Sequence, residues 1–276
     1  MSQPPPAEID EARPVQRTHW WREVIIVAAF YGLYTLVRDL RGDKPVSAVQ
    51  AFTNARRIIH LERWVGIFHE ADVQKAFLPA RWLIRLCDDY YGSAHFIVTV
   101  AVLVVMFFWF PTKYRAWRNS LALTTGLALV GFYFFPLMPP RLLPPGYHFV
   151  DTLEQIGGLW NFSSGPVNDV SNLYAAMPSL HCAWAAWCAC ALSTVVRPVW
   201  GKVLLFLYPA FTIFAVVVTA NHYFGDCIAG LLLLVVSVLI ARPVTGAADR
   251  RAHRRASAAV HDAHHRSDVV AADAAP

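Results

Sequence analysis

The chain has 276 residues, of which 56% are hydrophobic and 16% are charged, and its formal net charge is +5 at pH 7. Soluble domains typically carry about 25% charged residues, so this composition excludes an ordinary soluble globular protein and indicates an integral membrane protein. The positive charge does not indicate a nucleic acid partner, because the basic residues lie between apolar spans or in the tail and no nucleic-acid-binding motif is present.

The N-terminal residues 1–19 are rich in proline and polar side chains, and we predict that they are disordered. The first apolar stretch begins too late for a cleavable signal peptide, and it contains Arg22 and Glu23. We therefore expect this stretch to remain in the protein as a membrane anchor.

Six apolar stretches approach the roughly 17 to 25 residues with which a helix crosses a bilayer. They cover residues 21–37, 94–110, 120–136, 180–196, 203–220 and 227–241. We predict an all-α integral membrane protein with one domain over residues 20–242, in which six transmembrane helices form a bundle.

Three other segments are not expected to cross the membrane. Residues 38–92 alternate charged and hydrophobic side chains at helical spacing, which predicts an amphipathic interfacial segment on the membrane surface. Residues 138–177 are rich in proline and glycine, and a loop of this length is usually functional. The tail, residues 243–276, is basic and contains histidines that are weak evidence for a metal site, and its composition predicts disorder.

An even number of spans places both termini on one side of the membrane and the polar motifs described next on the other. Lysine and arginine are concentrated at the ends of the spans on the side of the termini. The positive-inside rule then places the termini in the cytosol. We expect the plasma membrane of a bacterium, with the polar motifs on the extracytoplasmic face.

The first polar motif follows the third apolar stretch and consists of Pro139, Pro140 and Arg141. Ionisable groups so close to a bilayer indicate a functional site. A guanidinium on a stiff backbone is suited to binding two oxygens of one phosphate group. Arg141 is therefore a candidate phosphate-binding residue.

The second motif, Pro-Ser-Leu-His at Pro178–His181, opens the fourth stretch. Proline followed by serine is a favourable helix start. The free N–H groups and the positive dipole end of such a start bind phosphate. Ser179 and His181 thus lie where an anionic substrate would be held.

The third motif, Asn-His-Tyr-Phe-Gly-Asp at Asn221–Asp226, opens the sixth stretch. Residues four apart lie on one face of a helix, so Asp226 can reach the ring of His222. A carboxylate on one ring nitrogen fixes the tautomer and leaves the other nitrogen as a nucleophile or base. With His181 for proton transfer and Arg141 for anion binding, the motifs supply the groups that phosphoryl transfer requires.

Simpler explanations apply to isolated histidines. A single histidine near an apolar span, such as His95 or His148, is more often a hydrogen-bonded structural group than a catalyst. A metal site made by His181, His222 and Asp226 is an alternative, but their spacing is a weak zinc signature. We expect no metal and no other cofactor.

These motifs make the sequence resemble the type 2 phosphatidic acid phosphatase superfamily, and within it the inositol phosphorylceramide synthase-like, or inositolphosphotransferase, branch. The resemblance covers about residues 56–241. It implies a six-helix membrane bundle that works without a metal and whose last-motif histidine becomes phosphorylated. Carried over by position, it implies that His222 is the nucleophile, Asp226 orients it, His181 is the general acid, and Arg141 and Ser179 bind the phosphate.

The sequence departs from the wider superfamily at three positions. That superfamily has a lysine seven residues before its first-motif arginine and a serine-arginine pair seven and six residues before its last histidine. Phe134, Ala215 and Val216 occupy these positions here. Two phosphate-binding cations are thus missing, which favours the synthase-like branch because that branch tolerates their loss.

We therefore predict a membrane enzyme, a lipid phosphotransferase that moves a phosphoryl or inositol-phosphate group through a phosphohistidine intermediate. With water as the acceptor, the same groups would make a phosphatase acting on phosphatidyl or polyprenyl phosphate. An alternative of another class is a non-enzymatic transporter or lipid-binding protein that uses the polar cluster as an ion site. The expected partners are the bilayer and a phospholipid or other lipid-phosphate substrate, and the sequence does not indicate an oligomeric state.

Overall fold

The structure, a computed structural model, describes residues 19–39, 47–157 and 173–273. Over these ranges the chain is helical, and a single isolated bridge joins Leu137 to Ala175. The helices are α1 (Trp20–Asp39), α2 (Ala48–Val65), α3 (Glu70–Phe77), α4 (Arg81–Trp109), α5 (Pro111–Phe134), η1 (Pro140–Leu142), η2 (Pro145–Tyr147), α6 (Thr152–Gln155), α8 (Leu180–Ser193), α9 (Val199–Val218) and α10 (Phe224–Asp273). The prediction of an all-α protein is confirmed for the described residues.

Among the described residues, three helices are long and apolar enough to cross a membrane: α4, α9 and the Phe224–Ala252 part of α10. The 14-residue α8 is apolar but shorter. These helices confirm the prediction of a membrane protein, whereas the count of six spans stays a prediction.

A buried ion pair joins α1 to α5. Glu23 of α1 forms a 2.5 Å ion pair with Arg118 of α5 and accepts a 2.7 Å hydrogen bond from the hydroxyl of Tyr114. Both side chains of the ion pair are largely buried, at 17% and 15% exposure. Glu23 and Arg118 therefore neutralise one another where α1 packs on α5.

The helix that contains the second apolar stretch begins before that stretch, because α4 starts at Arg81 rather than near residue 94. Ile84, Cys87 and Asp88 are buried along one face of this first part of α4. The region expected to lie entirely on the membrane surface is thus divided between α2, α3 and the start of α4. The amphipathic pattern itself is present in α2, which buries a stripe that includes Ala55 and Ile59.

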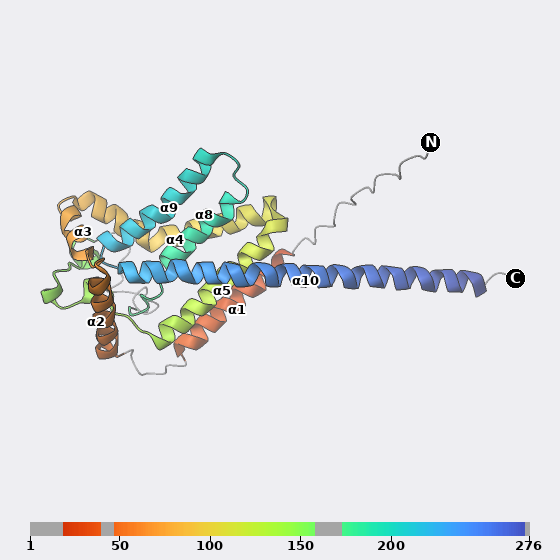
Figure 1. Cartoon of the computed structure of the whole chain (residues 1–276), viewed down its shortest axis with the longest axis horizontal. Coiled ribbons are helices and arrows are strands. Elements are labelled where there is room, and N and C mark those ends of the chain that lie inside the picture. The colour runs from red at the N-terminus through yellow and green to blue at the C-terminus, as the bar shows by residue number, and fades with distance from the viewer. Residues whose placement is uncertain (1–18, 40–46, 158–172, 274–276) are drawn as a thin grey trace.

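The C-terminal tail also differs from expectation, since α10 continues as one helix through Asp273 where the sequence predicts disorder from residue 243. Figure 1 shows α10 running the length of the bundle and continuing well beyond it. The tail after Pro243 is rich in alanine and arginine, and the high helix propensity of these residues favours a helix there.

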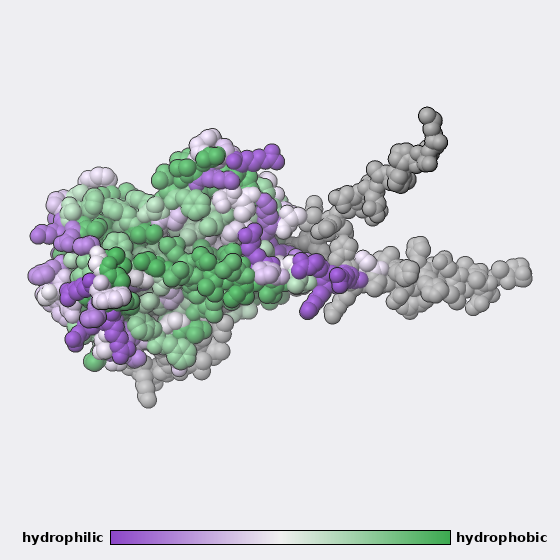
Figure 2. Space-filling model, viewed as in Figure 1, coloured by the Kyte–Doolittle hydropathy of each residue, from purple (hydrophilic) through white to green (hydrophobic). Residues whose placement is uncertain are grey.

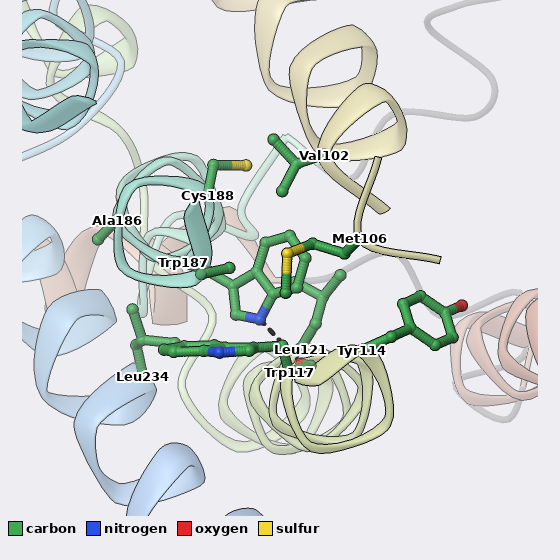
Figure 3. Packing of buried hydrophobic residues seen from close by; sticks show 10 residues of the cluster. Val102, Met106, Tyr114, Trp117, Leu121, Ala186, Trp187, Cys188 and Leu234 are labelled. Carbon is green, nitrogen blue, oxygen red and sulfur yellow. Dashed lines mark hydrogen bonds between the residues drawn. The ribbon is translucent and has the colours of Figure 1, made fainter. Parts of the chain in front are cut away.

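The largest hydrophobic cluster joins α4, α5, α8 and α10 (Figure 3). The indole of Trp187 is fully buried at its centre and donates a 2.9 Å hydrogen bond to the carbonyl oxygen of Trp117. Val102 and Met106 of α4 and Leu234 of α10 surround these two rings. A buried indole with its N–H satisfied is a stable anchor, so this cluster fixes α8 between its neighbours.

Hydrophobic side chains cover the middle of the visible face of the molecule, and hydrophilic side chains gather at the end that holds α2 and α3 and again farther along α10 (Figure 2). Large apolar residues such as Phe96, Val100, Leu232 and Leu239 are more than half exposed. A contiguous exposed apolar band of this kind fits a bilayer.

A second hydrophobic cluster lies where α10 begins, at the end of the bundle covered by α2 and α3 (Figure 1). Ile58 and Ile59 of α2 pack there with Leu137 and the fully buried Tyr223. The hydroxyl of Tyr223 donates a 3.0 Å hydrogen bond to the carbonyl oxygen of Met138. This packing fixes the start of α10 against the segment that carries Arg141.

Two glycines allow the start of α8 to approach its neighbours closely. A Cβ atom added to Gly230 of α10 would collide with the backbone of Ser179, and one added to Gly131 of α5 would lie 2.7 Å from the ring of Pro178. The second motif is therefore held between α5 and α10 by direct contact with the backbone.

Candidate active site

His222 lies in the short connection between α9 and α10. The backbone N–H groups of Asn221 and His222 donate to the carbonyl oxygen of Val216 at 2.9 and 3.1 Å, so the connection turns tightly on the end of α9. Ala220 completes the turn with a φ of 53°. The turn delivers His222 directly in front of the first residues of α10.

Asp226 holds the ring of His222 from the first turn of α10. The distance between His222 Nδ1 and Asp226 Oδ2 is 3.0 Å, and the same oxygen accepts a 3.1 Å hydrogen bond from the backbone N–H of Tyr223. Both residues are buried, with His222 at 3% exposure and Asp226 at 0%. Because the Asp226 carboxylate can only accept, the hydrogen of the neutral ring is assigned to Nδ1, and Nε2 keeps a lone pair.

The free nitrogen of His222 faces the second histidine. His222 Nε2 lies 3.4 Å from Nδ1 of His181, which is the second residue of α8. The ring of His181 stacks on Tyr91 at a centroid distance of 4.2 Å, and His95 contacts its edge at the same distance. Two residues of α4 therefore fix the ring of His181, and the two histidines from distant motifs meet.

Tyr91 was not identified from the sequence, and His95 was interpreted there as a structural histidine. The structure gives His95 such a hydrogen bond, 3.0 Å between its Nδ1 and the carbonyl oxygen of Tyr91, but also places its ring against His181. The four-residue spacing of Tyr91 and His95 on one helix is the signal that relates them.

Arg141 lies beside the turn that carries His222. Its backbone N–H donates to the carbonyl oxygen of Ala220 at 2.8 Å, and its Nε donates to Oδ1 of Asn221 at 3.1 Å. Its Nη1 forms a 2.7 Å ion pair with Asp151, and the side chain is 9% exposed. Within the described ranges Nη2 has no hydrogen-bond acceptor, so one edge of the guanidinium can bind an anion.

Ser179 is the N-cap of α8 and joins it to α10. Its hydroxyl oxygen accepts a 3.4 Å hydrogen bond from the N–H of Cys182, and its own N–H donates to the carbonyl oxygen of Asp226 at 3.0 Å. The residue is fully buried. Ser179 thus fixes the start of α8, including His181, relative to Asp226, and its binding of phosphate stays a prediction.

Buried carboxylates that no sequence motif indicated lie near this cluster. Glu62 and Glu70 are 1% and 0% exposed, and Asp88 accepts a 3.0 Å hydrogen bond from the hydroxyl of Thr152. Burial raises the pKa of Glu62 to about 9, with the neighbouring charge of Glu70 as the next cause. Glu62 continues the buried stripe of Ala55 and Ile59 at helical spacing, and an acid in an apolar stripe is the signal that would have found it.

The described residues include no group of three or more histidine, cysteine, aspartate or glutamate side chains placed to hold a metal ion, so we name no metal ligands. An open hollow on α2 is lined by Thr53, Arg56, Arg57 and His60. The hollow is exposed to solvent, unlike the buried histidine pair, and we do not assign it to the active site.

The fold and the site define a helical membrane protein with a buried His-Asp pair, a second histidine and an arginine at one end of its bundle. The chain belongs to the PAP2 superfamily, whose family model matches residues 56–240, a range that contains every candidate site residue. Comparisons with curated proteins and with solved structures gave no match. Members of this superfamily are typically phosphatases, and membership indicates phosphatase or phosphotransferase activity on a phosphate-containing substrate.

Proposed function

We propose that the protein is a membrane lipid phosphotransferase of the inositolphosphotransferase branch, which moves a phosphoryl or inositol-phosphate group through a phosphohistidine on His222. The observation that carries this proposal is the pair of histidines, with Nε2 of His222 facing His181 at 3.4 Å and Nδ1 held by Asp226. A nucleophile oriented by a carboxylate and facing a second proton-transfer group matches the needs of a two-step transfer.

In the first step the donor phosphate enters between the two rings and displaces the contact between them. The lone pair on Nε2 of His222 attacks phosphorus, a nitrogen–phosphorus bond forms and the bond to the leaving oxygen breaks. His181 gives its proton to that oxygen. The edge of Arg141 and the N–H groups at the start of α8 bind the non-bridging oxygens, whose charge develops during the step.

In the second step an alcohol on the acceptor attacks phosphorus. His181 takes the proton of the alcohol, the nitrogen–phosphorus bond breaks, and His222 returns to its starting state with Asp226 still bound to Nδ1. The same groups thus serve both steps in opposite directions. No metal takes part in this mechanism.

Transfer to an alcohol is favoured over hydrolysis by the residues that the chain lacks. Phe134, Ala215 and Val216 stand where the wider superfamily has two cations and a serine, and Ala215 and Val216 are fully buried in the core. A phosphatase that acts on phosphatidyl or polyprenyl phosphate is the second candidate, and the typical activity of the superfamily supports it.

The test uses purified protein, phospholipids labelled in the headgroup phosphate, and candidate alcohols. We expect labelled product only when an acceptor is present, and an acid-labile phosphate on the protein. Changing His222→Asn should abolish both turnover and labelling, because no nucleophile is left. The matched control is His60→Gln, since His60 is exposed on α2.

Three outcomes decide among the candidates. Release of phosphate that no alcohol affects would support the phosphatase and overturn the transferase. Labelling that survives in His222→Asn would exclude His222 as the nucleophile. Binding or transport of lipid without any turnover or labelling would support the non-enzymatic alternative.

We also propose that the enzyme lies in the plasma membrane of a bacterium with its active site on the extracytoplasmic face. The charge bias of the sequence supports this orientation. The site lies at the same end of the bundle as α2 and α3, the end that Figure 2 shows to be rich in hydrophilic side chains.

A further inference from the structure

Two buried glutamates from different helices meet at the first turn of α10. Glu62 of α2 accepts a 2.6 Å hydrogen bond from the backbone N–H of Gly225, and Glu70 of α3 accepts a 2.9 Å hydrogen bond from that of Phe224. The first N–H groups of a helix have no partner within the helix. The two side chains therefore supply acceptors to consecutive N–H groups that would otherwise be unsatisfied in the protein interior.

The second oxygen of each carboxyl group is buried without a donor. Both Glu62 Oε2 and Glu70 Oε2 lack a hydrogen-bond partner, and across the described ranges neither side chain forms an ion pair with a cation. Two adjacent buried carboxylates with unpaired oxygens would repel one another and would be costly to desolvate.

One proton bound to the pair would remove the repulsion between the carboxylates and supply a donor to their unpaired oxygens. The two carboxyl groups bind the N–H groups of consecutive residues, which places them next to each other, and two ionised carboxylates cannot hydrogen-bond to one another because both are acceptors. A proton on one of them becomes the donor, and the other accepts it. The pair then carries one negative charge, which is favourable at the positive end of α10.

The glutamate pair binds the same turn of the chain that carries Asp226, the partner of His222. Phe224 and Gly225, which the glutamates bind, are the two residues between Tyr223 and Asp226 in the sequence, and Asp226 Oδ2 holds both His222 and the N–H of Tyr223. A shift of this turn would therefore move the carboxylate that orients the nucleophile. A Cβ atom on Gly225 would lie 3.0 Å from Glu62 Oε1, so the close approach depends on glycine.

We propose that Glu62 and Glu70 are positioning residues for His222, acting as one carboxylic acid–carboxylate pair that shares a proton and fixes the first turn of α10. The proposal rests on the proposed function, since it concerns the same reaction. The other titratable groups that face the pair are Asp226, Tyr223 and Cys227, at the start of α10 and just before it.

The first experiment measures turnover of the variants Glu62→Gln, Glu62→Ala and Glu62→Asp. Glutamine keeps an acceptor for Gly225 and gains a donor for Glu70, so kcat should stay within roughly threefold of the wild type. Alanine and aspartate lose the reach to Gly225, and a misplacement of about 1 Å can cost roughly 100-fold, which should appear in kcat and not in KM. The matched control is Glu154→Gln, because Glu154 is exposed on α6.

The second experiment is independent of activity and uses infrared spectroscopy of the purified protein at neutral pH. The wild type and Glu154→Gln should show the carbonyl band of a buried protonated carboxyl group. The band should lose the same component in Glu62→Gln and in Glu70→Gln, because either change leaves one carboxylate with a neutral donor, and any contribution from the buried Asp88 should remain.

The outcomes separate this proposal from the proposed function. If the wild type turns over no lipid phosphate, the proposed function fails, whereas the infrared band still tests the shared proton. A wild type without the band would overturn the shared proton. A kcat of Glu62→Asp equal to that of the wild type would overturn the positioning role. This test remains decisive if Glu62→Ala fails to fold.

Discussion

At the scale of single residues, the site depends on what each ring nitrogen of His222 contacts. Asp226 Oδ2 accepts a hydrogen bond from Nδ1 of His222, and Nε2 on the opposite side of the ring faces His181. The carboxylate fixes the tautomer and stabilises the positive charge that the ring acquires when it attacks phosphorus. We therefore expect Asp226 to affect the reaction by orienting His222, without contacting the substrate itself.

The change Asp226→Asn tests this role. The amide can donate to Nδ1 and so favour the wrong tautomer, in which Nε2 carries the hydrogen and cannot attack. We expect kcat to fall roughly 100-fold or more, with little change in KM. The measurement is steady-state turnover of a labelled phospholipid, and a normal rate of phosphoenzyme formation in Asp226→Asn would contradict the assignment.

The change Arg141→Lys tests phosphate binding. Lysine keeps the charge but has all its donors on one nitrogen, whereas Arg141 binds Asn221 and Asp151 through two separate nitrogens and has a third for a phosphate oxygen. Losing one hydrogen bond to a charged group costs about 1.5 to 3 kcal/mol, so KM for the donor lipid should rise roughly tenfold or more. Arg56→Lys on the exposed face of α2 is the control, and equal KM values in the two variants would refute the role of Arg141.

At the scale of elements, the start of α8 is positioned by backbone contact. Gly230 of α10 leaves no room for a side chain against Ser179. In Gly230→Ala the two helices must separate, which should lower stability by about 1 to 3 kcal/mol and also lower kcat, because His181 follows Ser179. Thermal unfolding in detergent and turnover measure the two effects.

Gly146 in η2 supplies the control for this prediction, since nothing lies within 4 Å of a Cβ atom added there. Gly146→Ala should therefore leave the melting temperature close to that of the wild type. Similar melting temperatures in both glycine variants would show that the α8–α10 contact is less tight than the structure describes.

The sequence predicted which segments are helical and which motifs lie close together better than it predicted where the helices begin and end. Apolar periodicity located α8 and α9 closely, because apolar runs coincide with these helices. It missed the start of α4 and the extension of α10, because polar residues such as Asp88 are buried by neighbouring helices and alanine-rich sequence can form helix without apolar faces.

The candidate site was predictable where residues are related by short spacing. His222 and Asp226 are four residues apart, and the structure describes the predicted contact. Glu62 and Glu70 were not found, because their partners are backbone N–H groups more than 150 residues away in the chain. Long-range partners of this kind depend on how α2 and α3 pack on the end of the bundle.

At the scale of the whole molecule, the buried glutamate pair should make stability depend on pH. Burial and the charge of Glu70 raise the pKa of Glu62 from 4.5 to about 9. A raised carboxyl pKa means that the folded state retains a proton that the unfolded state loses. The stabilisation is complete below pH 4.5 and is lost as the pH rises toward 9.

Thermal unfolding across this pH range checks the sign. The melting temperature of the wild type should decrease as the pH rises, and that of Glu62→Gln should decrease less, because glutamine does not titrate. Glu154→Gln should follow the wild type. A steeper decrease in Glu62→Gln than in the wild type would contradict the raised pKa of Glu62.

Orientation in the membrane is tested by cysteine accessibility in a variant without the five native cysteines. Glu154→Cys lies at the end of the bundle with the site, and Val199→Cys, 77% exposed in the wild type, begins α9. An impermeant thiol reagent should label the first in intact cells and the second only after permeabilisation. The opposite pattern would place the site in the cytosol.

The burial of His222 determines whether a phosphoenzyme would react with water or transfer its phosphoryl group to an alcohol. A histidine in open contact with solvent would lose its phosphate to water, which greatly outnumbers any lipid alcohol. His222 is only 3% exposed and is enclosed by Tyr91, His181 and the start of α10. Exclusion of water protects a reactive intermediate. The lifetime of the phosphoenzyme without an acceptor is then a direct measure of how well the folded chain keeps water from one nitrogen–phosphorus bond.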